Sequence, residues 1–237
     1  MAQRKISVAK QKMSEAEAEQ LLLVDWLPSP FAARVRIALA EKGLKYESKE
    51  ENFPNKSDLL LQMNPVHKLL PVLIHNGKPI CESLIIVQYI DEVWNHEPKL
   101  LPSDPYQRAH ARFWADYIEK KIHQNTRRMV WASENEVKEA SKKEVIEGLK
   151  ILEGEIGEKP YFGGERFGYV DLVLIPIHSS IYTLEMMANL SLEVECPKLM
   201  KWAKKCMQKE SVSKSLCDQL KLYETLLELR KKLGIDQ

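Results

Sequence analysis

The sequence predicts two domains, a mixed α/β domain followed by an all-helical one. Up to about residue 94, short apolar runs bounded by turn signals alternate with segments of helical spacing, in the order βαβ, α, ββα. Beyond residue 105 the strand and turn signals disappear, and amphipathic helical patterns remain. With 237 residues, the chain is long enough for each domain to bury its own core.

The first strand and helix are marked by a serine between two prolines. Residues 21–26 form a short apolar run, which is typical of a buried strand. Ser29 and Pro30 follow, and serine before a proline at the first helical position is a common helix start. Apolar residues then recur at helical spacing until Gly43, where a glycine after a lysine ends the helix.

The rest of the first domain contains three more strands and two helices. Residues 46–50 predict a second strand, and Ser57 is expected to cap a short helix. An asparagine-glycine turn between residues 71–75 and 78–81 predicts a β-hairpin. A final helix is expected to begin at Ser83 and to end near Trp94.

A proline-rich connector separates the two domains. Prolines cluster within residues 98–105, which divides a first domain at 21–97 from a second at 106–237. In the second, Tyr106, Phe113 and Tyr117 form a stripe that predicts a buried bundle helix. Further helices are expected near 136–154, 171–189, 197–210 and 215–232.

Residues 1–20 differ from the rest of the chain because four basic residues come before any acidic one. We expect a flexible tail; an organelle-targeting segment and an alternative start at Met13 stay open.

The formal net charge of +1 gives no general attraction for nucleic acid, and no apolar run is long enough to span a membrane. The four cysteines lack zinc-site spacing, so we expect no metal, reduced thiols and a cytoplasmic protein.

Several short motifs occur in one order that resembles the soluble glutathione transferases, in particular the plant tau class. The similarity covers nearly everything after residue 20, and the motifs are Trp26-x-Pro-Ser-Pro-Phe31, Arg34-Val-Arg-Ile-Ala-Leu39, Asn64-Pro-Val-His67, Pro71-Val-Leu, Glu82-Ser83 and Cys196-Pro-Lys-Leu. The resemblance implies a thioredoxin-like first domain and a helical bundle. It also implies a homodimer in which the first domain of one subunit contacts the bundle of the other.

Ser29 is the predicted catalytic residue. A free thiol has a pKa of about 8.5, so most glutathione is protonated at neutral pH. A hydroxyl that donates to sulfur, together with the positive end of a helix, stabilises the thiolate. The alternative is that Ser29 is only a helix cap. Because relatives that exchange thiols carry cysteine at this position, serine favours conjugation with small hydrophobic electrophiles, and the same thiolate would serve in reducing organic hydroperoxides.

The resemblance also assigns residues to glutathione. A cis peptide bond before Pro71 would turn the backbone of Leu70 toward the cysteinyl unit. Glu82 and Ser83 would bind the ammonium and carboxylate of the γ-glutamyl end, although a strand end and a helix cap are the alternative. Lys56 would approach the glycine carboxylate. The family usually has a second lysine where this chain has Leu69, which predicts weaker glutathione binding by about 1 kcal/mol.

The electrophile is expected between the domains, on a wall that combines apolar and polar side chains. By their positions in the family, the residues assigned to this wall are Phe31, His123, Arg127, Val130, Thr225 and Leu229. A separate motif, Gly168-Tyr-Val-Asp171, resembles a helix-capping box and predicts a role in folding.

Two other functions stay open. The protein could carry hydrophobic ligands without converting them, and Leu69 keeps this alternative open. A thiol-disulfide enzyme would need a cysteine near the site, such as Cys81, which the strand pattern instead predicts to be a buried apolar residue.

Overall fold

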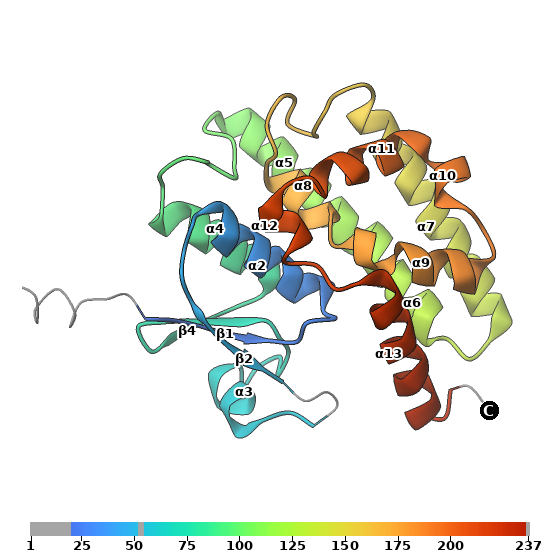
Figure 1. Ribbon diagram of the computed structural model, residues 1–237, viewed down its shortest axis with the longest axis horizontal. Coiled ribbons are helices and arrows are strands. Elements are labelled where there is room, and N and C mark those ends of the chain that lie inside the picture. Colours follow the sequence, from blue (N-terminus) through green and yellow to red (C-terminus); the bar gives the residue numbers. More distant parts are fainter. Residues whose placement is uncertain (1–19, 52–54, 236–237) are drawn as a thin grey trace, which may run out of the picture.

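The computed structural model describes residues 20–51 and 55–235, and it has the predicted order of two domains (Figure 1). Of the predicted tail, all but Gln20 lies outside the described residues. The elements of the first domain are β1 (Leu21–Asp25), α2 (Pro30–Glu41), β2 (Glu47–Glu50), α3 (Asp58–Met63), β3 (Val72–His75), β4 (Lys78–Cys81) and α4 (Ser83–Val93). The predicted βαβ, α, ββα order is therefore confirmed.

The first domain is built on a mixed sheet with strand order β2-β1-β3-β4. β1 pairs in parallel with β2 and antiparallel with β3, and β3 and β4 form the predicted hairpin. Its turn residues, Asn76 and Gly77, have φ angles of 50° and 78°, which explains the choice of asparagine and glycine.

Both faces of the sheet are covered, as Figure 1 shows with α2 and α4 on one side and α3 on the other. Side chains alternate along a strand, so Leu23 and Leu73 join the core under α2 and α4. Val24 and Val72 point the opposite way, into a smaller cluster with Leu60 of α3. The apolar strands therefore serve two cores, which accounts for their nearly continuous hydrophobicity.

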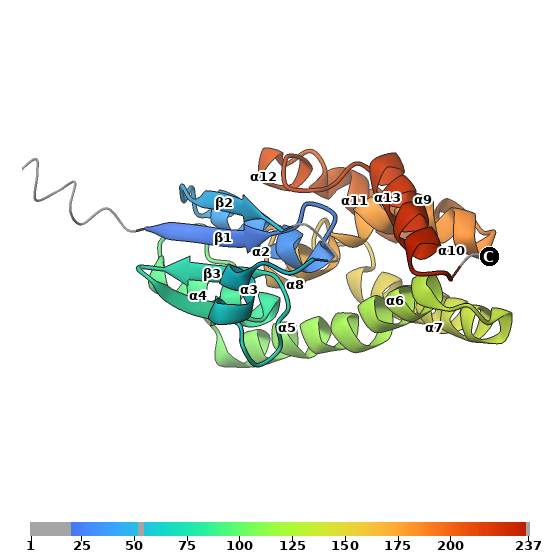
Figure 2. The same ribbon diagram turned by 90° about the horizontal axis from the view of Figure 1, so that it is seen from below.

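The second domain is helical throughout its described part. Its elements are α5 (Pro105–Tyr117), the π-helix η1 (Ile118–His123), α6 (Gln124–Trp131), α7 (Asn135–Ile156), α8 (Tyr169–Leu174), α9 (Ile177–Ala188), α10 (Leu192–Glu195), α11 (Pro197–Cys206), α12 (Glu210–Ser213) and α13 (Gln219–Lys232). Figure 2 shows α5, η1 and α6 following one another along one side of the molecule.

Four predictions for this domain need correction. The helix expected at 197–210 ends at Cys206, and a separate short helix, α12, begins at Glu210. The helix expected at 171–189 is two helices, because Pro176 has no N–H to continue α8. The last helix begins at Gln219 rather than near 215, because the Asp218 carboxylate caps it. Of the stripe expected to be buried on α5, Tyr106 and Phe113 face outward, 79% and 58% exposed, and Tyr117 is half-buried against the core. Small alanines on another face of α5 are buried instead.

A buried ion pair fixes the start of the connector to the first domain. Lys42 Nζ lies 2.7 Å from Asp91 Oδ1 and also donates to the carbonyl of His96. The carboxylate of Asp91 accepts from the backbone N–H groups of Leu100 and Leu101, at 2.9 Å each. One lysine and one aspartate therefore hold the chain from His96 to Leu101, which includes the first half of the connector. Within the described residues, no helix is long and apolar enough to cross a membrane.

Asp171 is the polar centre of the second domain. Its carboxylate is fully buried and accepts from Phe162 N at 2.9 Å, Gly168 N at 3.0 Å and Trp202 Nε1 at 2.8 Å. Burial raises the pKa of Asp171 to about 6, against the lowering effect of these donors. The carboxylate joins α8, the loop before it and α11, so the predicted capping contact from Gly168 is one part of a larger network.

Replacing Asp171 with alanine should destabilise the fold by about 3 kcal/mol, because three buried donors lose their acceptor. Thermal and urea denaturation followed by circular dichroism would measure this loss. Asp116→Ala is the control, since that carboxylate is exposed and pairs with Lys120 only at the surface. An Asp171→Ala protein as stable as the unmodified chain would contradict the assignment.

Candidate active site

Ser29 lies where the sequence predicts, at the N-cap of α2. Its Oγ accepts from Ala32 N at 3.2 Å, and its own N–H donates to the carbonyl of Trp26. A hydroxyl has one hydrogen as well as lone pairs, so a serine that accepts from the helix can still donate. The hydroxyl thus lies at the positive end of α2, where a negatively charged partner is favoured.

The loop that carries Ser29 is held by a second buried ion pair. Arg36 Nη1 lies 2.6 and 2.7 Å from the two carboxylate oxygens of Asp25, at the end of β1. The same guanidinium donates to the carbonyl of Leu27 inside the loop and to that of Ser215, just before α13. Strand, loop and C-terminal segment are therefore fixed by one side chain.

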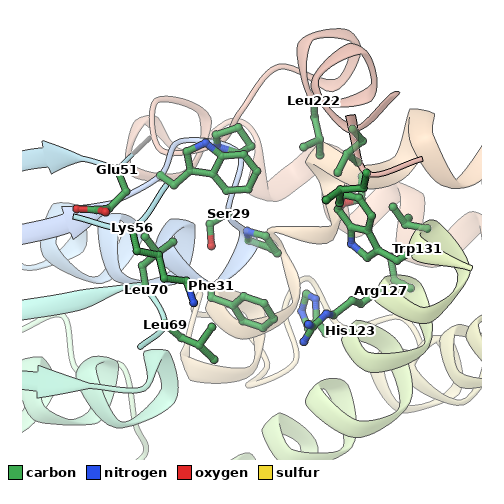
Figure 3. Close-up of a pocket in the computed structure, with 18 of the residues that line it drawn as sticks. Ser29, Phe31, Glu51, Lys56, Leu69, Leu70, His123, Arg127, Trp131 and Leu222 are labelled. Atoms are coloured by element: carbon green, nitrogen blue, oxygen red, sulfur yellow. The ribbon is translucent and has the colours of Figure 1, made fainter. Parts of the chain in front are cut away.

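A cavity of about 540 Å³ opens beside Ser29, between the two domains (Figure 3). Its wall is mostly apolar, and the polar residues are gathered mainly at two places, Glu51, Asn55, Lys56 and Lys68 on the first domain and His123, Thr126 and Arg127 on the second. The apolar residues include Trp26, Phe31, Leu69, Leu70, Val130, Trp131, Leu222 and Leu226. A pocket of this size and composition suits a small, largely hydrophobic molecule held by a few polar groups.

The first-domain side of the cavity contains the residues predicted to meet the cysteinyl and glycine parts of a tripeptide. Lys56 and Leu70 both line it, and the bond from Leu70 to Pro71 is cis, as predicted. Leu69, which is 51% exposed, lines the cavity between Lys68 and Leu70. The loop is held by Asn64, whose side chain donates to the carbonyl of Leu69 at 2.8 Å.

Glu82 and Ser83 lie beside this cavity rather than in its wall. Cys81 pairs with Val72 in the hairpin, so Glu82 continues β4 at the level of Pro71. Ser83 is the first residue of α4, but its hydroxyl makes no cap. Instead it accepts from the guanidinium of Arg34 at 3.1 Å. The alternative that Ser83 is a simple capping serine is therefore wrong.

The residues predicted to contact the electrophile are only in part those that line the cavity. Phe31, His123, Arg127 and Val130 line the cavity, and the rings of Phe31 and His123 lie 5.6 Å apart. Figure 3 shows His123 and Arg127 across the cavity from Lys56, with Phe31 between them.

The two residues predicted from α13 do not line the cavity and are replaced by Leu222 and Leu226. The hydroxyl of Thr225 turns back to the carbonyl of Lys221, at 2.7 Å, and Leu229 is buried in the helix packing with 6% exposure. Helical spacing alone could not separate these neighbours, because all four belong to a broad apolar face of α13. Trp26 and Thr126 were also missed, as neither has a distinctive local signal.

Two titratable groups near the site are held neutral. Burial and the charge of Arg34 hold the pKa of His123 well below its ordinary value, although the carbonyl of Val173 opposes the shift. Burial and the neighbouring Glu82 raise the pKa of the Cys81 thiol. Cys81 therefore lacks the lowered pKa of a reactive thiolate, which disfavours the thiol-disulfide alternative.

Comparison with known proteins identifies the architecture. Two family models match, the glutathione S-transferase N-terminal domain over residues 19–92 and the glutathione S-transferase C-terminal domain over residues 110–210. A probable glutathione S-transferase of Nicotiana tabacum, parC, is 59% identical over 219 residues, covering 92% of this chain and 99% of the relative. The chain belongs to the glutathione S-transferase family.

Two solved structures narrow the class of this transferase. Rice GST1 in complex with glutathione has a TM-score of 0.86 and 42% identity, covering 91% of this chain and 98% of that one. The tau-class enzyme of mango has a TM-score of 0.83 and 42% identity, covering 89% and 98%. The resemblance to the plant tau class is thus confirmed, and the carrier alternative is not favoured.

Leu69 is the clearest departure of this transferase from its family motif, and Leu69→Lys should strengthen glutathione binding. A lysine there would face the carboxylate end of the tripeptide and lower the Michaelis constant for glutathione by about fivefold, the equivalent of a partly exposed ion pair of about 1 kcal/mol. Steady-state kinetics with varied glutathione would measure it.

Val66→Lys is the matched control for that experiment. Val66 is 81% exposed in the same loop and does not line the cavity. The Val66→Lys variant therefore adds the same positive charge away from the glutathione. Equal effects of the two variants would mean that general charge, and not the position of Leu69, sets the affinity.

Proposed function

We propose that this transferase adds the thiol of glutathione to small hydrophobic electrophiles, with Ser29 as the residue that stabilises the thiolate. The observation that supports this most directly is the geometry of Ser29. Its Oγ accepts from the first turn of α2 and leaves the hydroxyl hydrogen for the sulfur, at the mouth of an apolar cavity. A hydrogen bond from Ser29 to the thiolate would lower the pKa of the glutathione thiol, because it stabilises the charged form. The low polarity of the surrounding cavity would strengthen that hydrogen bond.

The reaction then needs no covalent step on the protein. The glutathione thiol releases its proton to solvent, and Ser29 donates a hydrogen bond to the resulting sulfur anion. The sulfur attacks the electrophilic carbon, a C–S bond forms, and a leaving group such as chloride departs with the electron pair of its bond. Holding both reactants in one cavity supplies the remaining acceleration by proximity.

Glutathione would lie along the first domain, residues 21–97. Lys56 is assigned to the glycine carboxylate, and the backbone of Leu70 to the cysteinyl unit. Glu82 and Ser83 are assigned to the ammonium and carboxylate of the γ-glutamyl end, beyond the cavity wall. The tripeptide would thus extend from the cavity toward the N-terminus of α4.

The electrophile would lie against the second domain, residues 106–237, which follows the connector at 98–105. Val130 forms an apolar part of this wall, and His123 and Arg127 supply its polar part. Phe31 of α2 adds an apolar ring from the first domain, 5.6 Å from the ring of His123. We place the enzyme in the cytoplasm, a location supported by its four unpaired cysteines.

Ser29→Ala should lower the turnover number for chlorodinitrobenzene by about a hundredfold. This is the size of effect expected when one hydrogen-bond donor to an anion, here the glutathione thiolate, is removed. The absorbance of the bound thiolate in the ultraviolet should disappear at neutral pH while glutathione still binds. Ser57→Ala is a matched control, since Ser57 caps α3 with the same 3.2 Å bond to Leu60 N but lies on a different helix. If both variants lost the thiolate equally, Ser29 would be only a cap.

We also propose a homodimer that covers the aromatic stripe on α5. Tyr106, His110, Phe113, Trp114 and Tyr117 follow one another ring against ring. Tyr106 and Phe113 are exposed, while Trp114 and Tyr117 are half-buried against the core. Neighbouring exposed aromatic rings of this kind are typical of an interaction surface. Figure 2 places α4 beside α5, where Arg112 donates to Gln88, so that the exposed Ile85 of the first domain extends the surface toward a partner bundle.

Phe113→Glu should convert the dimer to a monomer, because the carboxylate would have to be buried against apolar side chains. Light scattering coupled to size-exclusion chromatography would measure the mass. Val194→Glu on α10 is the control, since Val194 is 78% exposed but lies apart from the stripe. A dimer that survives Phe113→Glu would place the interface elsewhere.

A further inference from the structure

A second cavity, of about 550 Å³, is formed by η1, α6 and α7, and Figure 2 shows α6 and α7 side by side. Arg128 of α6 lines this second cavity, whereas its neighbour Arg127 lines the active-site cavity. Successive residues on a helix point about 100° apart around its axis, so α6 presents a different side to each cavity. The second cavity is therefore separate from the places proposed for glutathione and the electrophile.

Positive charge dominates the second cavity. Among the described residues that line it, four are lysine or arginine and two are glutamate. The full set is Lys120, Lys121, Gln124, Asn125, Arg128, Ala140, Ser141, Lys143, Glu144 and Glu147. The active-site cavity, by contrast, has a mostly apolar wall. A polar cavity with an excess of positive charge suits an anion better than it suits a hydrophobic electrophile.

The two glutamates of the second cavity are already paired with lysines. Glu144 lies 3.1 Å from Lys121 Nζ, which joins α7 to η1, and Glu147 lies 3.9 Å from Lys143 Nζ. For Arg128, residues 20–51 and 55–235 place no carboxylate within 4.0 Å of the guanidinium. Its planar guanidinium is thus available to bind two oxygens of an anion at once.

A buried serine is a second, independent sign of a ligand. Ser141 lines the second cavity from α7, yet it is only 1% exposed. In the part of the chain that the structure describes, its hydroxyl oxygen is buried without a hydrogen-bond partner. An unpaired buried hydroxyl is unfavourable, and a bound ion is one of the partners that can satisfy such a group. An oxygen of a ligand in this cavity would complete it.

We propose that the second cavity binds a small molecule that carries a phosphate or sulfate ester group, held by Arg128, Lys143 and Ser141. Such a group has three terminal oxygens, which match the guanidinium, the ammonium and the hydroxyl. A carboxylate has two oxygens, and an arginine fork engages both, so no third oxygen is left for the hydroxyl. The proposal is independent of the reaction proposed for Ser29, since no residue lines both cavities.

Calorimetric titration with phenyl phosphate and phenyl sulfate tests this proposal. The protein is first saturated with S-hexylglutathione, which occupies the active-site cavity, and benzoate is the probe that carries a carboxylate on the same ring. We expect a single class of ester site and binding of benzoate that is about tenfold weaker. The tighter ester identifies the head group. The proposal is wrong if neither ester binds, or if benzoate binds as tightly as both.

Arg128→Gln should weaken ester binding by about tenfold, because it replaces a charged fork with a neutral amide. Arg166→Gln is the matched control, since Arg166 is an exposed arginine that lines neither cavity. Its effect should be within about twofold of the unmodified protein. Equal losses in the two variants would mean that general charge attracts the esters, which contradicts a site at Arg128.

Ser141→Ala separates a binding role from a structural one. Because the Ser141 hydroxyl has no partner within the described residues, its removal should leave the melting temperature unchanged or raise it. Ester binding should nevertheless weaken by about fivefold, as expected for the loss of one hydrogen bond. A lower melting temperature with unchanged ester affinity would show that Ser141 serves the packing of α7 and not a ligand. Neither measurement requires turnover, so failure of the conjugation reaction would leave this test intact.

Discussion

The buried ion pair of Asp25 and Arg36 fixes the parts of the chain on which the cavity depends. Asp25 ends β1 and Arg36 lies on α2, so together they hold the loop that brings Ser29 to the start of the helix. The guanidinium also holds the carbonyl of Ser215, before the helix that forms the opposite wall. This pair therefore fixes the position of the Ser29 loop relative to the apolar wall contributed by α13.

Helix α2 links the two domains because its two arginines point in different directions. Residues two apart on a helix are about 200° apart around its axis, so Arg34 and Arg36 project from opposite sides. One reaches Glu119 and α8 in the second domain, and the other reaches the strand, the loop and the C-terminal segment. The helix that supplies its dipole to Ser29 is therefore held on both flanks by charges that cannot move independently.

The two sides of the cavity wall match what the two proposed reactants require. A tripeptide is polar at both ends, and the first domain offers backbone, lysine and carboxylate groups along its edge. An apolar electrophile requires contact area without specific partners, which Phe31, Trp131 and the leucines of α13 provide. Ser29 lies where the two surfaces meet, so under the proposed reaction a thiolate held there would be surrounded mostly by apolar side chains. In a poorly solvated site, a single donor contributes more than it would in water.

The sequence by itself determined features whose cause lies within a few neighbouring residues. The cap at Ser29 and the turn at Asn76 and Gly77 depend on local hydrogen bonds and φ angles, so their residue types predicted them. Which face of α13 meets the cavity, and that Thr225 turns away from it, depended on packing between helices. Ser83 received its partner from a position 49 residues earlier in the chain. Only the tertiary structure decided such contacts, because spacing along a helix fixes a face and not what lies opposite it.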